Sequence, residues 1–294
     1  MKLAHIYSRL IATPWFVNEA TLSAITQLLQ SRMNGGGLLE NPAAARRSLD
    51  KSRAGSSQQR DITPAALALP VKTGSAAPSP ATGTAVIPVF GVLGKHLSEL
   101  ETMCGGCDMG AIRQSFDAAM ADPAIKQVVL YFDSPGGMAT GCHELFTHMV
   151  NAKTKPLYAY TDTVCASAAY YLAAASDAIF AAPTARVGSV GTMLLVVDES
   201  AKNAAEGVKF TIFRSGAHKG LGDPSQPLTE QQTGILQGLV DQLGTRFRTD
   251  VSSARPSIAA ADMEGLAYLG TEAKAKGFVD DVANDLPALL AALA

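Results

Sequence analysis

The sequence predicts an α/β protein with a mostly parallel sheet. From residue 84 onward, short apolar runs rich in Val, Ile, Tyr and Phe alternate with longer segments of helical period. Strands that alternate with helices are typical of βαβ crossover units, whose connections are almost always right-handed. The chain has 294 residues, 47% of them apolar, so it is long enough to bury a substantial core.

Six apolar runs are expected to form strands, because β-branched and aromatic residues dominate them. They are residues 85–90, 127–132, 157–160, 178–181, 192–197 and 209–213. The segments between these runs carry apolar residues at helical spacing, so they are expected to form helices. These helices are residues 109–120, 139–150, 165–175 and 199–206.

A long helix is expected to follow in the last quarter of the chain. Thr229 and Gln232 have the three-residue spacing of a capping box, which marks a helix start. One apolar face then continues along the segment. It consists of Leu236, Leu239, Leu243, Phe247 and Val251.

The first 83 residues differ in composition from the rest. Residues 18–33 have helical spacing, with Asn18 as a candidate N-cap, whereas residues 48–83 are rich in Ser, Gly, Pro and Ala. Such a composition buries too little apolar area to offset the entropy of ordering. We therefore expect a helical appendage (1–47), a flexible linker (48–83) and one main domain (84–294).

Charge and hydropathy exclude several classes of protein. The chain has 24 Lys and Arg against 26 Asp and Glu, a net charge of -2, whereas nucleic-acid or anionic-membrane binding requires a basic excess. The longest uncharged apolar stretch has 14 residues, between Asp162 and Asp177, short of the roughly 20 that span a bilayer. No signal peptide is recognised. Four cysteines are too few for a disulfide framework, which favours a reducing compartment.

Three motifs carry chemistry, and the first is a strand that runs into a pair of glycines. Residues 128–134 are apolar up to Asp133-Ser134, and Pro135, Gly136 and Gly137 follow. Two glycines allow positive φ and let a ligand approach the backbone, whose N–H groups could stabilise an oxyanion. An ordinary strand-to-helix turn has the same pattern.

The second motif places Ser167 among small residues at the start of an apolar helix. The small neighbours leave room for a substrate backbone, so Ser167 could be a nucleophile. A helix-capping serine in a packed core is the alternative.

The third motif is a glycine-flanked basic pair, His218-Lys219, that follows the run ending at residue 213. A lysine acts as a general base only if burial lowers its pKa from about 10.4 to near 7 or 8. The motif therefore requires a dry cleft, and a solvated loop lysine is the alternative.

Taken together, the motifs resemble the signal peptide peptidase A (SppA) family of Ser-Lys peptidases, and within it the phage head maturation proteases of the minor capsid protein C group. The resemblance covers residues 84–282, about two thirds of the chain. The matching pieces occur in the family's order: DSPGG (133–137), ASAAYY (166–171), VGSVG (187–191), SGAHK (215–219) and YLGT (268–271), then Ala273 and GFVD (277–280).

The resemblance implies a role for each matching residue. Ser167 would be the nucleophile, Lys219, 52 positions later, its general base, and Ser189 the hydroxyl that orients the lysine. The backbone N–H groups of Gly136 and Ser167 would form the oxyanion hole. Substrate would bind as an added strand. The residues implied for that contact are Ser134, Pro135, Gly137, Gly188 and Val190. No cofactor and no metal are implied.

The resemblance also implies the fold and the biological setting. The fold would be the Clp protease/crotonase-type spiral of βαβ units. The activity would be a serine endopeptidase that cleaves phage capsid, portal or scaffold proteins in the host cytoplasm, within the assembling procapsid, as a homo-oligomer whose neighbouring subunits can complete the site. One departure is that Ala168 and Ala169 follow the serine where the family often has glycine, which would narrow the S1 pocket toward small side chains.

Other interpretations remain open at this stage. His143 or His148 could form a triad with Ser167 and either Asp162 or Asp177, and Cys104 and Cys107 have the spacing of a zinc or redox pair. The protein could also be a catalytically weak structural or scaffolding capsid component, a general cytoplasmic SppA-like protease that degrades peptides, or an acyl-CoA enzyme of the related crotonase fold.

Overall fold

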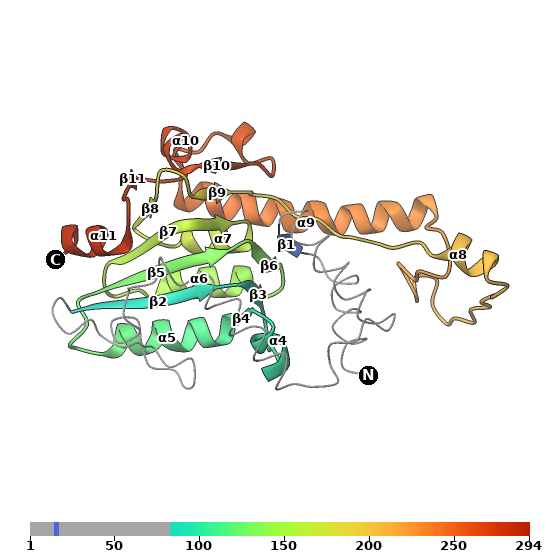
Figure 1. Ribbon diagram of the computed structural model, residues 1–294. Helices are drawn as coiled ribbons and strands as arrows, with labels where there is room; N and C mark the ends of the chain where they lie inside the picture. The colour runs from blue at the N-terminus through green and yellow to red at the C-terminus, as the bar shows by residue number, and fades with distance from the viewer. Residues whose placement is uncertain (1–14, 18–82) are drawn as a thin grey trace, which may run out of the picture.

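The computed structural model describes residues 15–17 and 83–294 (Figure 1). Within these residues, seven strands form a large sheet in the order β10-β9-β7-β5-β2, with β8 beside β7 and β11 beside β8. The strands are β2 (Thr84–Phe90), β5 (Gln127–Ser134), β7 (Leu157–Ala166), β8 (Ala178–Ala181), β9 (Arg186–Gly188), β10 (Ala267–Leu269) and β11 (Asp281–Val282). All pairs in this sheet are parallel except β9 with β10.

Successive strands are joined by helices, as expected for crossover units. The helix α5 (Met109–Ala121) connects β2 to β5, α6 (Cys142–Ala152) connects β5 to β7, and α7 (Ala168–Ala173) connects β7 to β8. Each new strand adds on the same side of the previous one, because β5 lies between β2 and β7. The α/β class with a mostly parallel sheet and a run of βαβ units is therefore confirmed.

The two faces of the sheet pack against different layers. Alternate residues such as Ile87 and Leu130 face the main core, which they share with α5, α6, α7 and α9. Their neighbours Val86 and Val129 face a smaller cluster with Leu286 and Leu289 of α11 (Leu286–Ala292). The period of two in these strands puts adjacent residues on opposite faces, so both faces are buried.

A second, small sheet lies at the end of β5. Its order is β1-β6-β3-β4, where the strands are β1 (Trp15–Val17), β6 (Gly136–Met138), β3 (Val92–Gly94) and β4 (Gly106–Asp108). The short helix α4 (Glu99–Met103) lies between β3 and β4 in sequence. Gly137 is required here, because a Cβ on it would lie 2.0 Å from the Leu93 carbonyl oxygen.

The long helix α9 (Glu230–Ala254) has the expected start. Thr229 Oγ1 accepts from the Gln232 N–H, and the Gln232 side chain accepts from the Thr229 N–H, which confirms the capping box. Its C-terminal half packs on the main core through Phe247 and Val251. The other helical elements of the described chain are α8 (Ser200–Ala205), a 3-10 turn (Ala260–Asp262) and α10 (Gly270–Ala275).

Two of the six expected strands are wrong. Residues 192–197 have only an isolated bridge at Met193, and residues 209–213 have no strand. Both runs are apolar enough to resemble strands, but no neighbouring strand of the described chain pairs with them. The strand expected at 157–160 continues instead to Ala166, so the helix expected from residue 165 begins at Ala168.

The expected appendage (1–47) and linker (48–83) lie outside the described residues, except for 15–17 and Gly83. The helix expected at 18–33 is therefore also outside them, whereas Trp15–Val17 form a strand that the sequence did not predict. Among the described residues, no helix combines the length and the apolar character needed to cross a membrane.

Candidate functional site

Ser167 lies in a sharp turn between β7 and α7. Its backbone angles are φ 55° and ψ -119°, in a region that L-residues rarely occupy. Such a conformation costs on the order of 1–3 kcal/mol and persists only where the surrounding structure enforces it. The surrounding structure holds this turn on both sides. Before it, Ala166 pairs within the sheet, and after it, all residues of α7 are buried. Ser167 itself is 2% exposed. The chain thus presents a serine at the end of a strand by a strained turn.

The glycine motif lies beside this serine. Ser134 is the register partner of Cys165, so the chain that continues to Gly136 runs beside the chain that continues to Ser167. The helix α7 also packs against β6, which begins at Gly136. Ser134 Oγ donates to the Gly91 carbonyl and accepts from the Gly136 N–H at 3.2 Å. Gly136 has φ 106°, a conformation that favours glycine.

Ser189 and its neighbours form the other side of the serine turn. Ser189 is buried with φ 56°, and its N–H donates to the Leu266 carbonyl at 2.6 Å. The Gly188 region is paired with β7 on one side and with β10 on the other, and the Val190 carbonyl accepts from the Gly265 N–H. Gly188 is therefore paired with a strand on both sides in this structure, whereas Val190 has a backbone bond to Gly265 alone among the described residues. A role of Gly188 and Val190 in binding substrate stays a prediction.

The expected oxyanion donors are both engaged in the described chain. The Ser167 N–H donates to the Gly188 carbonyl at 2.7 Å, and the Gly136 N–H donates to Ser134 Oγ. The Ser167 N–H is therefore not the free donor that the sequence suggested. The sequence analysis did not consider the backbone N–H of Ala168 as an oxyanion donor. Ala168 is the first residue of α7, and the N–H of a first helical residue has no acceptor within the helix. Its position directly after the candidate nucleophile, at the start of an expected helix, could have indicated this role from the sequence.

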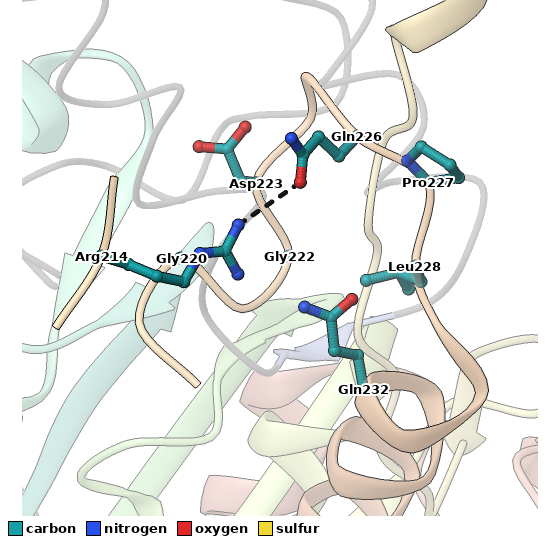
Figure 2. Close-up of a pocket in the computed structure, with 8 residues that line it drawn as sticks. All are labelled: Arg214, Gly220, Gly222, Asp223, Gln226, Pro227, Leu228 and Gln232. Carbon is teal, nitrogen blue, oxygen red and sulfur yellow. Dashed lines mark hydrogen bonds between the residues drawn. The ribbon is translucent and has the colours of Figure 1, made fainter. Parts of the chain in front are cut away.

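Lys219 lies far from Ser167 in the same chain. It is exposed, in turns that connect α8 to α9, and this connection projects away from the body of the protein, beyond the start of α9 (Figure 1). Figure 2 shows that the connection folds onto the first turns of α9. Arg214 Nη2 donates to Gln226 Oε1 at 3.3 Å, and Gly220 lines a polar hollow together with Gln232.

The length of α9 sets the separation. Gln232 beside the lysine segment and Phe247 beside α7 are 15 residues apart in one continuous helix, which corresponds to about 22 Å at 1.5 Å per residue. This distance is far beyond the reach of a lysine side chain. Within one chain of this structure, the two members of the expected dyad do not meet, and the dry cleft that a neutral lysine requires is not formed around Lys219.

The histidines do not support a triad with Ser167. His143 Nδ1 pairs with Asp250 at 2.7 Å, and His148 Nε2 pairs with Asp117 at 2.5 Å. The candidate third members are also engaged elsewhere. Asp162 accepts from the Tyr131 hydroxyl, and Asp177 accepts from Lys153 Nζ and the Leu157 N–H.

The cysteine pair has no metal-site geometry around it. Cys104 is exposed, and burial raises the pKa of Cys107 to about 11, which disfavours the thiolate that binds metal or exchanges disulfides. Among the residues that the structure describes, no three His, Cys, Asp or Glu side chains gather as metal ligands. Cys165, two residues before Ser167, is fully buried, and burial raises its pKa as well, so it is not an alternative nucleophile.

Fold and site together define an α/β protein that presents a buried serine on a strained turn beside a glycine-rich strand. Residues 150–292 match the profile of Peptidase family S49. The chain is 30% identical over 210 residues to the capsid assembly protease C of Escherichia phage lambda, which covers 70% of this chain and 48% of that protein. It is 29% identical over 205 residues to the head-tail preconnector protein GP5 of Enterobacteria phage P21, covering 69% of this chain and 41% of that protein.

A relative that carries the SppA name in Enterococcus faecium is 31% identical over 173 residues, 57% of this chain and 50% of that protein. These matches confirm the resemblance that the motifs indicated, to the S49 and SppA-like peptidases. This chain spans about half the length of the curated relatives that it matches. Among solved structures, a point mutant of ClpP1 from Listeria monocytogenes matches at TM-score 0.41 and 12% identity, over 69% of this chain and 94% of that chain.

Proposed function

We propose that this protein is a serine endopeptidase in which Ser167 is the nucleophile and Lys219 of a neighbouring copy is the general base. The observation that carries the proposal is the Ser167 turn. A buried, strained serine between the glycine strand and the Ser189 turn has the placement of a nucleophile. The family matches agree with this class of chemistry.

The position of the lysine supports a base supplied across a subunit contact. The connection that carries Lys219 exposes large apolar side chains of the same segment, with Phe213 93% exposed and Phe210 51% exposed. Ile235 and Leu239, in the N-terminal half of α9, are exposed as well. Large apolar side chains that are exposed on one part of a protein favour a protein interface there. A neighbouring copy seated on this surface would cover the apolar side chains and bring a lysine to a serine site other than its own.

The chemistry then follows from these groups. Neutral Lys219 takes the proton of the Ser167 hydroxyl, and the oxygen attacks the carbonyl carbon of a peptide bond. The tetrahedral oxyanion is stabilised by backbone N–H groups. The proposed donors are the Ala168 N–H and the Gly136 N–H, which exchanges its 3.2 Å bond to Ser134 Oγ for the oxyanion when substrate is bound. Lys219 then protonates the leaving amine, and water hydrolyses the acyl-enzyme. Ser189, beside the serine turn, would hold the lysine in position.

Capsid, portal or scaffold proteins of a phage head are the proposed substrates, because two relatives carry names from phage head assembly. The proposed setting is an assembling procapsid in a host cell. A catalytically weak structural capsid component and a general peptide-degrading SppA-like protease are the competing functions. The first predicts no turnover by the pure protein, and the second predicts equal cleavage of unrelated unfolded proteins.

Complementation between two inactive variants tests the dyad. Ser167→Ala and Lys219→Ala are each expected to lose peptide hydrolysis, and a refolded 1:1 mixture is expected to regain it. If each site takes its serine and lysine from different copies, about a quarter of the sites in a random mixture are intact. A mixture as inactive as its components would contradict the shared site. Normal activity of Ser167→Ala alone would contradict the nucleophile.

A further inference from the structure

The strand β1 (Trp15–Val17) lies antiparallel along β6, the strand that begins at Gly136. The register pairs Trp15 with Met138, Phe16 with Gly137 and Val17 with Gly136. More than 100 residues separate these partners in the sequence. The N-terminal part of the chain is therefore held, through three residues, on the glycine motif.

This pairing uses the one edge of β6 that another strand can reach in the described part of the chain. The opposite edge faces β3, where Leu93 is the register partner of Gly137. The approach there is so close that a Cβ on Gly137 would lie 2.0 Å from the Leu93 carbonyl oxygen. A peptide that binds to β6 by strand addition must therefore take the position of β1. Both cannot be there at once.

The direction of β1 is also that of a substrate. Because Ser134 is the register partner of Cys165, the Gly136 end of β6 is the end beside the Ser167 turn, and the Met138 end is farther away. A chain that runs from Trp15 to Val17 thus approaches the serine with its C-terminal side leading. A substrate in this orientation would present the carbonyl of the residue opposite Gly136 to Ser167, as acyl transfer requires.

We propose that Trp15–Val17 is an intramolecular competitor for the substrate strand, so that substrate must displace the chain's own N-terminal segment to bind. The proposal rests on the proposed function of β6 as substrate strand and adds what occupies it at rest. A three-residue strand forms few hydrogen bonds, but tethered ligands reach effective concentrations on the order of millimolar. The affinity of Trp15–Val17 for β6 is therefore high enough for β1 to occupy the edge of β6 and low enough for a substrate peptide to displace it.

Two truncated chains separate the strand from the rest of the N-terminus. One begins at residue 18 and lacks β1, and its matched control begins at residue 14 and keeps it. We expect the chain from residue 18 to have a severalfold lower KM for a peptide substrate at similar kcat, and the chain from residue 14 to resemble the full chain. Phe16→Pro in the full chain should act like the deletion, because proline cannot donate to a ladder, whereas Phe16→Val should not.

A binding measurement keeps this inference separate from catalysis. In the Ser167→Ala background, a fluorescein-labelled peptide of residues 13–19 should bind the chain from residue 18 several times more tightly than the chain from residue 14. Equal KM values and equal peptide affinities of the two truncated chains would overturn the competitor. Peptide binding as expected, with no hydrolysis by any variant, would instead overturn the proposed function alone.

Discussion

The ring of Tyr171 stacks on the ring of Phe247, with 4.4 Å between the centroids and 8° between the planes. Tyr171 belongs to α7, four residues after Ser167, and Phe247 belongs to α9. The Tyr171 hydroxyl also donates to Asp250 on α9, which pairs with His143 on α6. The helix that follows the serine turn is thus fixed to the helix whose far end carries the Lys219 segment.

Removal of the stacked ring should loosen both helices. We expect Phe247→Ala to lower the free energy of unfolding by about 3–5 kcal/mol, because it leaves a large cavity in the core. Peptide hydrolysis should fall with it, since the Ser167 turn depends on the position of α7. Gln231→Ala, on the exposed half of the same helix, should change stability by no more than about 0.5 kcal/mol. Urea unfolding measures both, and a similar loss in the two variants would contradict this account.

A methyl group at Gly137 should be far more harmful than one at Gly234. The added Cβ at Gly137 would meet the Leu93 carbonyl at 2.0 Å, whereas nothing lies within 4 Å of a Cβ at Gly234 on α9. We expect Gly137→Ala to separate β6 from β3 and to yield little folded protein. Gly234→Ala should stabilise the chain by about 0.5–1 kcal/mol through helix propensity. Circular dichroism and thermal melting distinguish the two, and equal melting temperatures would refute the close approach.

Buried tyrosines should make the fold sensitive to base. The Tyr170 hydroxyl is fully buried and donates to the Phe278 carbonyl at 3.0 Å, and burial raises the pKa of Tyr170 above its ordinary 10.0. The folded state therefore keeps this proton while the unfolded chain releases it. The stabilising contribution is complete below about pH 10 and is lost as the pH rises above it.

Tyr170→Phe tests this dependence. At neutral pH the variant should lose about 0.5–1.5 kcal/mol of stability with the hydrogen bond. Between about pH 9.5 and pH 11.5, its unfolding free energy should fall less steeply than that of the parent, because one raised pKa has been removed. Urea titrations across this range measure the slopes, and parallel slopes would show that Tyr170 does not contribute.

Loss of the Ser189 hydroxyl should move the pH optimum of hydrolysis upward. If Ser189 holds the neutral form of the general base, Ser189→Ala leaves the charged form relatively more favourable, so more alkaline solution is needed for activity. Ser176→Ala is the matched control. Ser176 is another buried serine, whose Oγ has no hydrogen-bond partner among the described residues. A pH profile of kcat/KM that is the same in both variants would remove Ser189 from the mechanism.

The sequence predicted the elements that local pattern determines. The apolar runs of β2, β5 and β8, the periodic faces of α5 and α6, and the capping box of α9 each contain their own signal, because side-chain spacing and cap chemistry act within a few residues. The order of the motifs around Ser167, Ser189 and Lys219 could also be recognised in the sequence. The matches to known proteins confirm the family resemblance that these motifs indicated.

The pairing between strands that are distant in the sequence could not be predicted from the sequence. The strands β1, β3, β6 and β9 have three residues each, too few to show a period of two, so they exist only because another strand lies beside them. Residues 209–213 have the composition of a strand, yet Phe210 and Phe213 remain exposed because nothing in the described part of the same chain pairs with that segment.

The sequence by itself thus determined the fold class and the identity of the candidate chemical groups, since both follow from residue type and spacing. Only the tertiary structure decided where those groups lie. It placed Ser167 beside Gly136 through the pairing of β5 with β7, put β1 on the glycine strand, and held Lys219 at the far end of α9. These positions depend on backbone hydrogen bonds and packing between residues far apart in the chain, and no local pattern specifies them.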